Sequence, residues 1–535
     1  MKTRRDPVRR RLSGGFEASL FWECGLVGLA GGLLVTLYRL SLSWAERTLR
    51  WLLGFMGSNP FLFATWMLAL VMLAGVVALL VRWEPKTSGS GIPQVDAEVM
   101  GAMDAPWRRV IMAKFAEGTL AALGGLSLGR EGPSVQLGGM AGKAVSRVLG
   151  RGRGEERLLV TCGAGAGMAA AFHAPLTGVM FALEEIHKTF NAALIVSAMS
   201  AAVVADYVSS DLLGIKPVLS FAVTSTVPRS AYLLILGFGI FMGVVGAAHN
   251  AGMFKAQDTL ARIRRWEPFA RFLIPFLMAA PIALCAPALL DGGDAIIEML
   301  ARPEGLSVAT LALLLLGKYL FTGVCFGAGV PGGTLFPLVA MGGLAGALFG
   351  QIAVMAFGLD PALIMNFTVL GVAGMFASAI RAPVTAVVLA FELTGSLQAL
   401  LSLSIVSLIA YVTANLMGVD PYYDHLLGKL LGMSTEEAHG RWGSEGKQLH
   451  SYVVESGSRA ADSKIRELNW PSQALVVTIT RHGRELVPNG ETLVEPGDRL
   501  LVLMNEVDGD HSEEMVRRLC RGTYAPRSTA EQSKR

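Results

Sequence analysis

Apolar segments of membrane-spanning length recur along this chain, and they limit its fold more than any other feature. A helical span of the bilayer needs about 20 apolar residues. Several segments are shorter and contain Gly or Pro, which favours broken or tilted helices. With 52% hydrophobic and 16% charged residues among 535, the chain is outside the soluble globular range, and we expect an all-α polytopic membrane protein. The segments are 26–42, 61–81, 231–248, 272–290, 306–320 and 399–417.

The second half of the apolar region repeats the first half. Internal repeats of this kind indicate two pseudo-symmetric halves with a substrate site at their interface near the bilayer midplane. We place the halves at about 17–210 and 231–431. At a spacing of 204, the repeated features are Lys114 and Lys318, Gly129 and Gly333, Pro133 and Pro337, and blocks 138–142 and 342–346; at a spacing of 208 they are 174–177 and 382–385, and Glu184 and Glu392.

The two ends of the chain differ from the apolar region in composition. Residues 1–16 are basic and precede the first span, so the positive-inside rule predicts a cytoplasmic tail there and we assign it no nucleic-acid partner. Residues 432–451 form a polar linker. Residues 452–521 contain short β-like runs broken by Pro-Gly turns, which predicts a small cytoplasmic α+β domain. We expect residues 522–535 to be disordered.

The stretch Gly129-Arg130-Glu131-Gly132-Pro133 places an acid deep in the apolar region. A charged side chain near the bilayer centre costs roughly 2.5 kcal/mol or more, so such residues usually face a pathway. Pro133 suits the first turn of a helix. Glu131 is therefore expected at a helix N-terminus, where free N–H groups and partial positive charge attract anions.

Three further stretches combine glycine or proline with polar groups at an expected helix start. They are Gly89-Ser90-Gly91-Ile92-Pro93, Gly333-Thr334-Leu335-Phe336-Pro337 and Pro421-Tyr422-Tyr423. Hydroxyl and amide groups bind anions without the full charge that would hold them too tightly for conduction. Together the four stretches predict an anion pathway.

This set of motifs resembles the CLC family of chloride channels and chloride/proton antiporters. Residues 89–93 match its GSGIP motif and 129–133 its GREGP motif, while 333–337 match GxFxP with Leu335 in place of the usual Phe. The resemblance extends over about residues 17–431. It implies the CLC fold of two inverted repeats, in a homodimer with one pore per subunit in the lipid of the cytoplasmic (inner) membrane and with both termini in the cytoplasm.

The resemblance also implies a role for each motif residue. Glu131 is the external gating and proton glutamate, whose carboxylate competes with chloride. The motif glycines and prolines and Arg130 form the helix termini around the anion: Gly89, Gly91, Pro93, Gly129, Gly132, Pro133, Gly333 and Pro337. The chloride ligands are the hydroxyls of Ser90 and Tyr423, the backbone amides of Thr334 and Leu335, and Phe326 lining the same site.

Proton coupling requires a second acid. Glu184 has a repeat partner in Glu392, which suggests a structural role, whereas Glu185 is unmatched. By resemblance Glu185 is the internal proton-transfer glutamate that antiporters carry and channels generally replace. We therefore predict exchange of chloride for protons without any cofactor, with a passive gated chloride channel of the same fold as the alternative.

The C-terminal domain resembles the TrkA-C (RCK-C) regulatory domain, in residues 464–468 and 475–480 and the turns at 488–490 and 496–498. It differs from the CBS pairs of eukaryotic-type CLC proteins. A small regulatory ligand and a simple dimer contact remain as alternatives for its role.

Other classes of protein fit the sequence less well. An intramembrane hydrolase needs a nucleophile and base or a metal site. HExxH does not occur, and the one GxSxG match, at 125–129, lies in an apolar stretch rather than in the strand–turn–helix context that this motif requires. A potassium protein, suggested by the tail domain alone, needs a TVGYG filter, which is absent. The five cysteines are scattered without a Cys-x-x-Cys pair, so the sequence predicts neither a disulfide framework nor a metal site.

Overall fold

The computed structural model describes residues 18–56, 60–214, 221, 227–263, 266–301, 306–435, 447–471, 474–481, 484–505 and 509–521. The chain divides into two compact units, Met1–Thr435 and Glu436–Arg535. The basic tail predicted at 1–16, the disordered tail at 522–535 and most of the linker at 432–451 lie outside the described residues.

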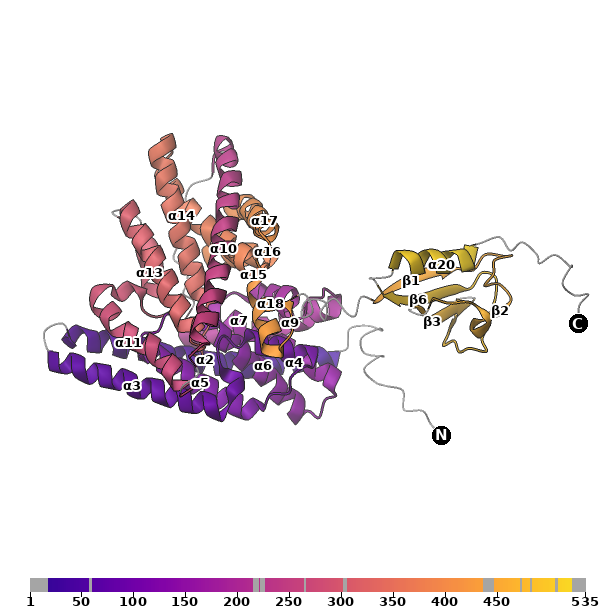
Figure 1. Ribbon diagram of the computed structural model, residues 1–535, viewed down its shortest axis with the longest axis horizontal. Helices are drawn as coiled ribbons and strands as arrows, with labels where there is room; N and C mark the ends of the chain where they lie inside the picture. The colour runs from indigo at the N-terminus through magenta and orange to yellow at the C-terminus, as the bar shows by residue number, and fades with distance from the viewer. Residues whose placement is uncertain are drawn as a thin grey trace, which may run out of the picture. The chain divides into compact units, whose positions relative to one another are not determined.

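The regular elements described in the first unit are all helices, which confirms the predicted class. Figure 1 shows the first half in indigo to purple and the second in magenta to orange. The first half contains α2 (Ala18–Met56), α3 (Pro60–Trp83), α4 (Ile92–Met100), α5 (Trp107–Leu123), α6 (Glu131–Val148), α7 (Arg153–Phe172), α8 (Pro175–Phe181), the π-helical η2 (Ala182–Ile186) and α9 (Ala192–Leu213). The second contains α10 (Tyr232–Leu260), α11 (Phe269–Cys285), α12 (Asp294–Leu300), α13 (Val308–Gly327), α14 (Leu335–Phe357), α15 (Leu363–Ile380), α16 (Pro383–Thr394), α17 (Leu400–Leu416) and α18 (Tyr422–Leu431).

Seven helices in the described part of the chain are long and apolar enough to cross a membrane. Three of them, α9, α14 and α15, are not among the predicted spans. They are about as apolar as α2, α10 and α13, which were predicted, so hydropathy was sufficient to identify them. Helix α15 is almost wholly buried in the protein. The span predicted at 272–290 is wrong at its end, because α11 stops at Cys285 before Pro287; a proline disfavours helical geometry in the residue before it.

Close helix crossings in the two halves use glycine in the same way. A Cβ built on Gly142 of α6 would lie 2.1 Å from the carbonyl oxygen of Leu159 on α7, and one on Gly346 of α14 would lie 2.1 Å from that of Phe367 on α15. Small residues let helix backbones approach closely in membranes. The repeated glycine blocks are therefore packing surfaces.

Two glutamates connect the halves by capping each other's helices. Glu392 of α16 accepts hydrogen bonds from the N–H groups of Leu176 (2.8 Å) and Thr177 (2.7 Å) and from the Thr177 hydroxyl (2.6 Å) at the start of α8. Glu184 accepts from the N–H and hydroxyl of Thr385, both at 2.7 Å, at the start of α16. Carboxylates are favourable at helix N-termini, so the structural role suggested for Glu184 has a physical basis.

The second unit contains an antiparallel sheet in the order β1-β6-β3-β4 and a two-stranded pair β2-β5. Its core contains Ile479, Leu500, Val502 and Val516, from two strands and the helix. The strands are β1 (Lys447–Val453), β2 (Ser463–Lys464), β3 (Ala474–Arg481), β4 (Arg484–Leu486), β5 (Leu493–Val494) and β6 (Arg499–Asn505), and the helix is α20 (Gly509–Arg521). The small α+β domain predicted from the sequence is present, but its first strand, β1, starts at Lys447, within the linker predicted at 432–451, rather than at 452.

Candidate functional site: an anion site between helix ends

The predicted motifs lie at helix starts, and backbone hydrogen bonds join them. Gly129 N–H donates to the Gly333 carbonyl (2.6 Å) and Gly333 N–H to the Gly129 carbonyl (2.8 Å). Gly89 N–H donates to the Gly329 carbonyl (3.2 Å), and Gly332 N–H to the Gly89 carbonyl (3.0 Å). Three loops distant in sequence are therefore held side by side. The helices that begin there are α4 at Ile92, α6 at Glu131 and α14 at Leu335, with Pro93, Pro133 and Pro337 in their first turns.

Three buried hydroxyls at this junction have no hydrogen-bond partner among the described residues. They belong to Ser90, Tyr422 and Tyr423, which are 3%, 2% and 1% exposed. The Ser90 hydroxyl lies against the start of α6, where a Cβ built on Gly132 would be 2.5 Å from its oxygen. Tyr423 lies in the first turn of α18, which packs on α4. Buried polar groups are normally paired, so these hydroxyls are suited to a ligand.

The remaining predicted chloride ligands lie around these hydroxyls. Thr334 and Leu335 are both buried at the start of α14. The Phe326 ring packs on Tyr422 at 5.5 Å between centroids, and Tyr422 packs on Tyr423 at 5.4 Å. Tyr422 also contacts the rings of His249 and Phe254. Tyr422 is thus part of an aromatic cluster, whereas Tyr423 interacts with the charges of Glu131 and Glu185.

The Glu131 carboxylate is fully buried between the two halves. Its Oε2 accepts a hydrogen bond from the Phe336 N–H at 3.2 Å, at the start of α14. A Cβ on Gly129 would be 2.2 Å from Oε2, and one on Gly333 would be 3.3 Å away. The carboxylate therefore rests over two glycines at a helix N-terminus of the opposite half. That is the environment in which an anion is stabilised.

Arg130, from the same motif, contacts other groups. Its guanidinium lies 5.2 Å from the centroid of the Phe336 ring and 3.9 Å from a carboxylate oxygen of Asp294. A small pocket of about 20 Å³ is lined by Arg130, Asp294, Glu131 and Tyr38, among others. The Glu131 carboxyl group, predicted to be the gate, thus borders a pocket whose other walls carry the positive charge of Arg130 and the negative charge of Asp294.

The second predicted acid, Glu185, lies in η2, a π-helical turn. Such turns are rare in proteins overall, but those that occur are often found at functional sites. Here the turn separates two neighbouring acids, since Glu184 caps α16 while Glu185 is 5% exposed and interacts with Lys188 and Asp424. Glu185 is thus at the meeting point of η2, α4 and α18.

Two buried residues that support the site had no role assigned from the sequence. The ammonium of Lys114 donates to the carbonyls of Thr87 and Gly89, both at 2.7 Å, and so orients the loop that carries Ser90. Glu117 accepts from the Thr87 hydroxyl at 2.9 Å. The signal was present in the sequence: Lys114 belongs to the repeat, and a lysine within an apolar helix needs nearby acceptors.

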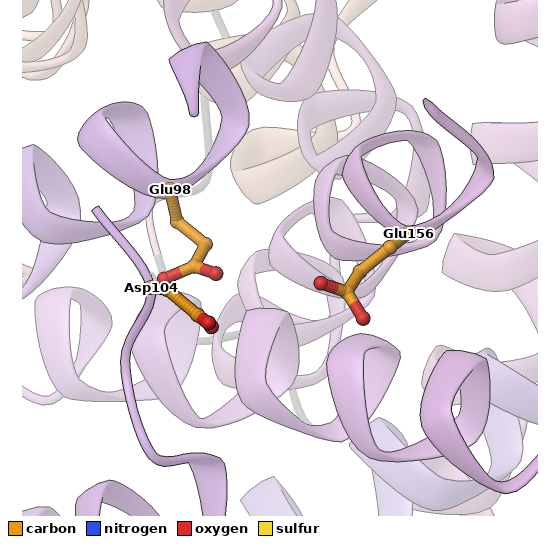
Figure 2. Close-up of side chains that lie close together, drawn as sticks. All are labelled: Glu98, Asp104 and Glu156. Carbon is orange, nitrogen blue, oxygen red and sulfur yellow. The ribbon is translucent and has the colours of Figure 1, made fainter. Parts of the chain in front are cut away.

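Three carboxylates elsewhere lie close enough together to hold a metal ion. Figure 2 shows Glu98, Asp104 and Glu156 facing one space. Protein cations already occupy it: Lys143 donates to Glu98 and Asp104, and Arg147 pairs with Glu156 at 2.5 Å. The cluster is therefore an ion-pair network in which the Lys143 ammonium takes the place that a metal ion would need.

Known proteins similar to this chain share its architecture. Residues 72–415 match the family described as voltage gated chloride channel, and residues 449–512 match the TrkA-C domain. An H(+)/Cl(−) exchange transporter ClcA from Vibrio cholerae serotype O1 (strain M66-2) is 34% identical over 419 residues, covering 76% of this chain and 88% of the relative. A ClcA from Vibrio campbellii (strain ATCC BAA-1116) is 32% identical over 446 residues, covering 80% and 93%.

Solved structures agree with these relatives. The crystal structure of a slow cyanobacterial Cl−/H+ antiporter has a TM-score of 0.75 and 26% identity, covering 78% of this chain and 99% of that one. A CLC-type fluoride/proton antiporter, at a TM-score of 0.62 and 24% identity over 76% of this chain and 96% of that one, shares the fold. This chain is a multi-pass membrane protein that belongs to the voltage-gated chloride channel (CLC) family and carries a C-terminal TrkA-C domain.

Proposed function

We propose that this protein exchanges chloride for protons across the cytoplasmic membrane. The observation that carries the proposal is the buried Glu131 carboxylate, which lies over Gly129 and Gly333 and accepts the Phe336 N–H. A carboxylate in an anion site competes with chloride. Protonation removes its charge and releases it, so proton binding and anion binding become linked. The relatives named as H(+)/Cl(−) exchangers support this function over a passive channel.

In this mechanism the central chloride is bound by Ser90 and Tyr423 hydroxyls and by the Thr334 and Leu335 amides, with Phe326 beside them. The partnerless Ser90 and Tyr423 hydroxyls support the assignment. Neutral donors bind an anion without trapping it, which conduction requires.

Glu185 transfers protons between the cytoplasm and Glu131. Its burial and its interaction with Tyr423, which also interacts with Glu131, support this role. A buried acid at such a position takes up and releases protons without direct exposure of the chloride site to water. The residues themselves supply every proton-binding group, and we assign no metal or organic cofactor.

The assembly follows the family. We propose a homodimer with one pore per subunit, with both termini in the cytoplasm, and a TrkA-C domain that binds a small regulatory ligand. The basic residues before the first span support this orientation. A cross-linked species of twice the monomer mass in detergent is the expected result for the dimer, and a monomer at all cross-linker concentrations would contradict it.

Flux from proteoliposomes tests the exchange. An imposed chloride gradient is expected to drive protons uphill. Glu131→Ala and Glu185→Gln are each expected to abolish proton movement while some chloride flux remains. Glu298→Gln, at an exposed acid of α12, is the control and should exchange as the unmutated protein does. Chloride flux without proton movement in the unmutated protein would establish the passive channel instead.

A further inference from the structure

Three ionisable side chains interact with Glu185 of η2, the predicted proton-transfer glutamate. They are Asp96 of α4, Lys188 just after η2, and Asp424 of α18. Asp96 is 0% exposed, and Glu185 and Asp424 are each 5% exposed. Lys188 interacts with all three carboxyl groups and forms an ion pair with Asp424. Glu184, on the capping side of η2, is the further charge that interacts with Glu185. Three buried carboxyl groups thus interact electrostatically with one ammonium, which is ion-paired with Asp424.

The same elements carry chloride ligands. Asp424 directly follows Tyr423 in the first turn of α18. Asp96 is on α4, which begins two residues after Ser90. A displacement of Asp424 therefore displaces the turn that holds the Tyr423 hydroxyl. The ion pair connects that turn to the segment that carries Glu185.

The backbone at Lys188 is constrained. Its φ is +50°, in the left-handed region that residues other than glycine seldom adopt. Such conformations persist where the surroundings determine them, and they gather at functional sites. The ion pair with Asp424 is one such determinant, because it directs the Lys188 side chain to the start of α18.

We propose that Lys188 is a positioning residue that couples the protonation of Glu185 to chloride binding at Tyr423. When Glu185 is charged, its carboxylate competes with Asp424 for the Lys188 ammonium. When Glu185 takes up a proton, that competition ends and Lys188 holds Asp424 more firmly. Tyr423 is then fixed in its chloride-binding position. By linkage, bound chloride in turn favours the protonated Glu185.

The inference rests on the proposed exchange function and on Glu185 as the inner proton carrier. The inference predicts the direction of the pH effect: chloride affinity should rise as pH falls through the range in which Glu185 takes up its proton. Direct repulsion between chloride and the Glu185 carboxylate has the same sign, but it does not depend on Lys188 or Asp424. Removing either partner of the ion pair therefore isolates the contribution of Lys188.

Chloride titration calorimetry on the full-length protein, below and above neutral pH, tests the coupling. Asp424→Asn and Lys188→Met are each expected to reduce the gain in chloride affinity at low pH by about fivefold or more, and to lower the number of protons moved per chloride in proteoliposomes. Lys188→Arg, and the exchange of both charges in Lys188→Asp with Asp424→Lys, are expected to restore much of the coupling.

A second ion pair on the same helix is the matched control. Lys429 of α18 pairs with Asp258 at 2.5 Å, and both side chains are more than a third exposed. Lys429→Met is expected to leave the pH dependence of chloride affinity unchanged. An equal loss in this variant would show that any disturbance of α18 uncouples transport, and it would overturn the proposal.

The Glu185→Gln variant separates the coupling role of Lys188 from a purely structural role of its ion pair, and both from the proposed exchange function. With Glu185 always neutral, Lys188→Met is expected to have no further effect on the pH dependence of chloride affinity. An equal effect in both backgrounds would mean that the ion pair is only structural. Proton exchange that persists in Glu185→Gln alone would refute the proposed function. Normal coupling in Asp424→Asn, with Glu185→Gln uncoupled, would refute only the role of Lys188.

Discussion

Substituting alanine for Gly129 should displace the gating carboxylate without altering any ionisable group. The added Cβ would lie 2.2 Å from Oε2 of Glu131, but 3.0 Å and 3.1 Å from Phe336 Cβ and Pro337 Cδ. The backbone of Gly129 is outside the left-handed region, so alanine requires no unusual conformation. The severe overlap is therefore with the flexible end of one side chain, which has to retreat by roughly 1 Å.

The magnitude follows from the bond that this retreat breaks. Glu131 Oε2 accepts the Phe336 N–H at 3.2 Å, and a hydrogen bond to a charged group contributes about 1.5–3 kcal/mol. A factor of ten corresponds to about 1.4 kcal/mol. The equilibrium between bound and displaced carboxylate thus shifts by about 10- to 150-fold. In the proposed mechanism chloride competes for the same position, so its apparent affinity is expected to rise by up to that factor.

A double-mutant cycle by chloride titration calorimetry measures this shift. Gly129→Ala alone is expected to bind chloride about tenfold or more tightly. Added to Glu131→Ala, the same substitution should change little, because no carboxylate remains to be displaced. Weaker chloride binding by an equal factor in both backgrounds would refute the reasoning, since it would show that the methyl group blocks the ion itself.

Three further experiments test other parts of the structure. Glu392→Gln and Glu184→Gln should each destabilise the folded protein by about 1–3 kcal/mol, seen as a lower thermal midpoint, because each caps a helix of the other half; unchanged midpoints would contradict this. Gly142→Ala places its Cβ 2.1 Å from a backbone oxygen, so it should destabilise the folded protein by about 2 kcal/mol or more and reduce the folded fraction in gel filtration. Gly139→Ala, whose Cβ would lie 3.4 Å from a side chain, is the control and should not reduce the folded fraction. Burial raises the pKa of Cys520 from 9.0 to about 11, so about a hundredfold less thiolate is present and maleimide labelling of Cys520 should stay slow until the tail domain unfolds. Cys520→Ser separates this signal from that of the exposed Cys285, and fast labelling of Cys520 in the folded protein would contradict the burial.

The helix ends at the anion site were predictable because the determinants are local. Glycine and proline around Ser90, Glu131 and Thr334 restrict the backbone within a few residues, and helices begin at these motifs as expected. The internal repeat, with its common spacing of 204, could also be recognised, because a repeat is a property of the sequence alone. The end of α11 was predicted too late in the chain because apolar residues continue past Pro287, whereas the α-helix ends before this proline.

Contacts between distant segments were not predictable in the same way. The proximity of Glu131 to the Phe336 amide depends on pairing of two loops through Gly129 and Gly333. The ion pair of Lys188 with Asp424 joins residues 236 positions apart. A pattern read along the chain contains no information on which of many charges meets which.

The class of fold, the repeat and the motif residues follow from the amino-acid sequence, because these depend on hydropathy and local backbone preference. Which acid caps a helix and which is buried beside a lysine depends on how the helices pack in three dimensions. Glu184 and Glu185 are neighbours in sequence, yet across the π-helical turn Glu184 caps α16, whereas Glu185 interacts with Asp424 of α18. The physical reason is that a side chain's partners are set by packing of separate elements, and that packing is a property of the whole fold.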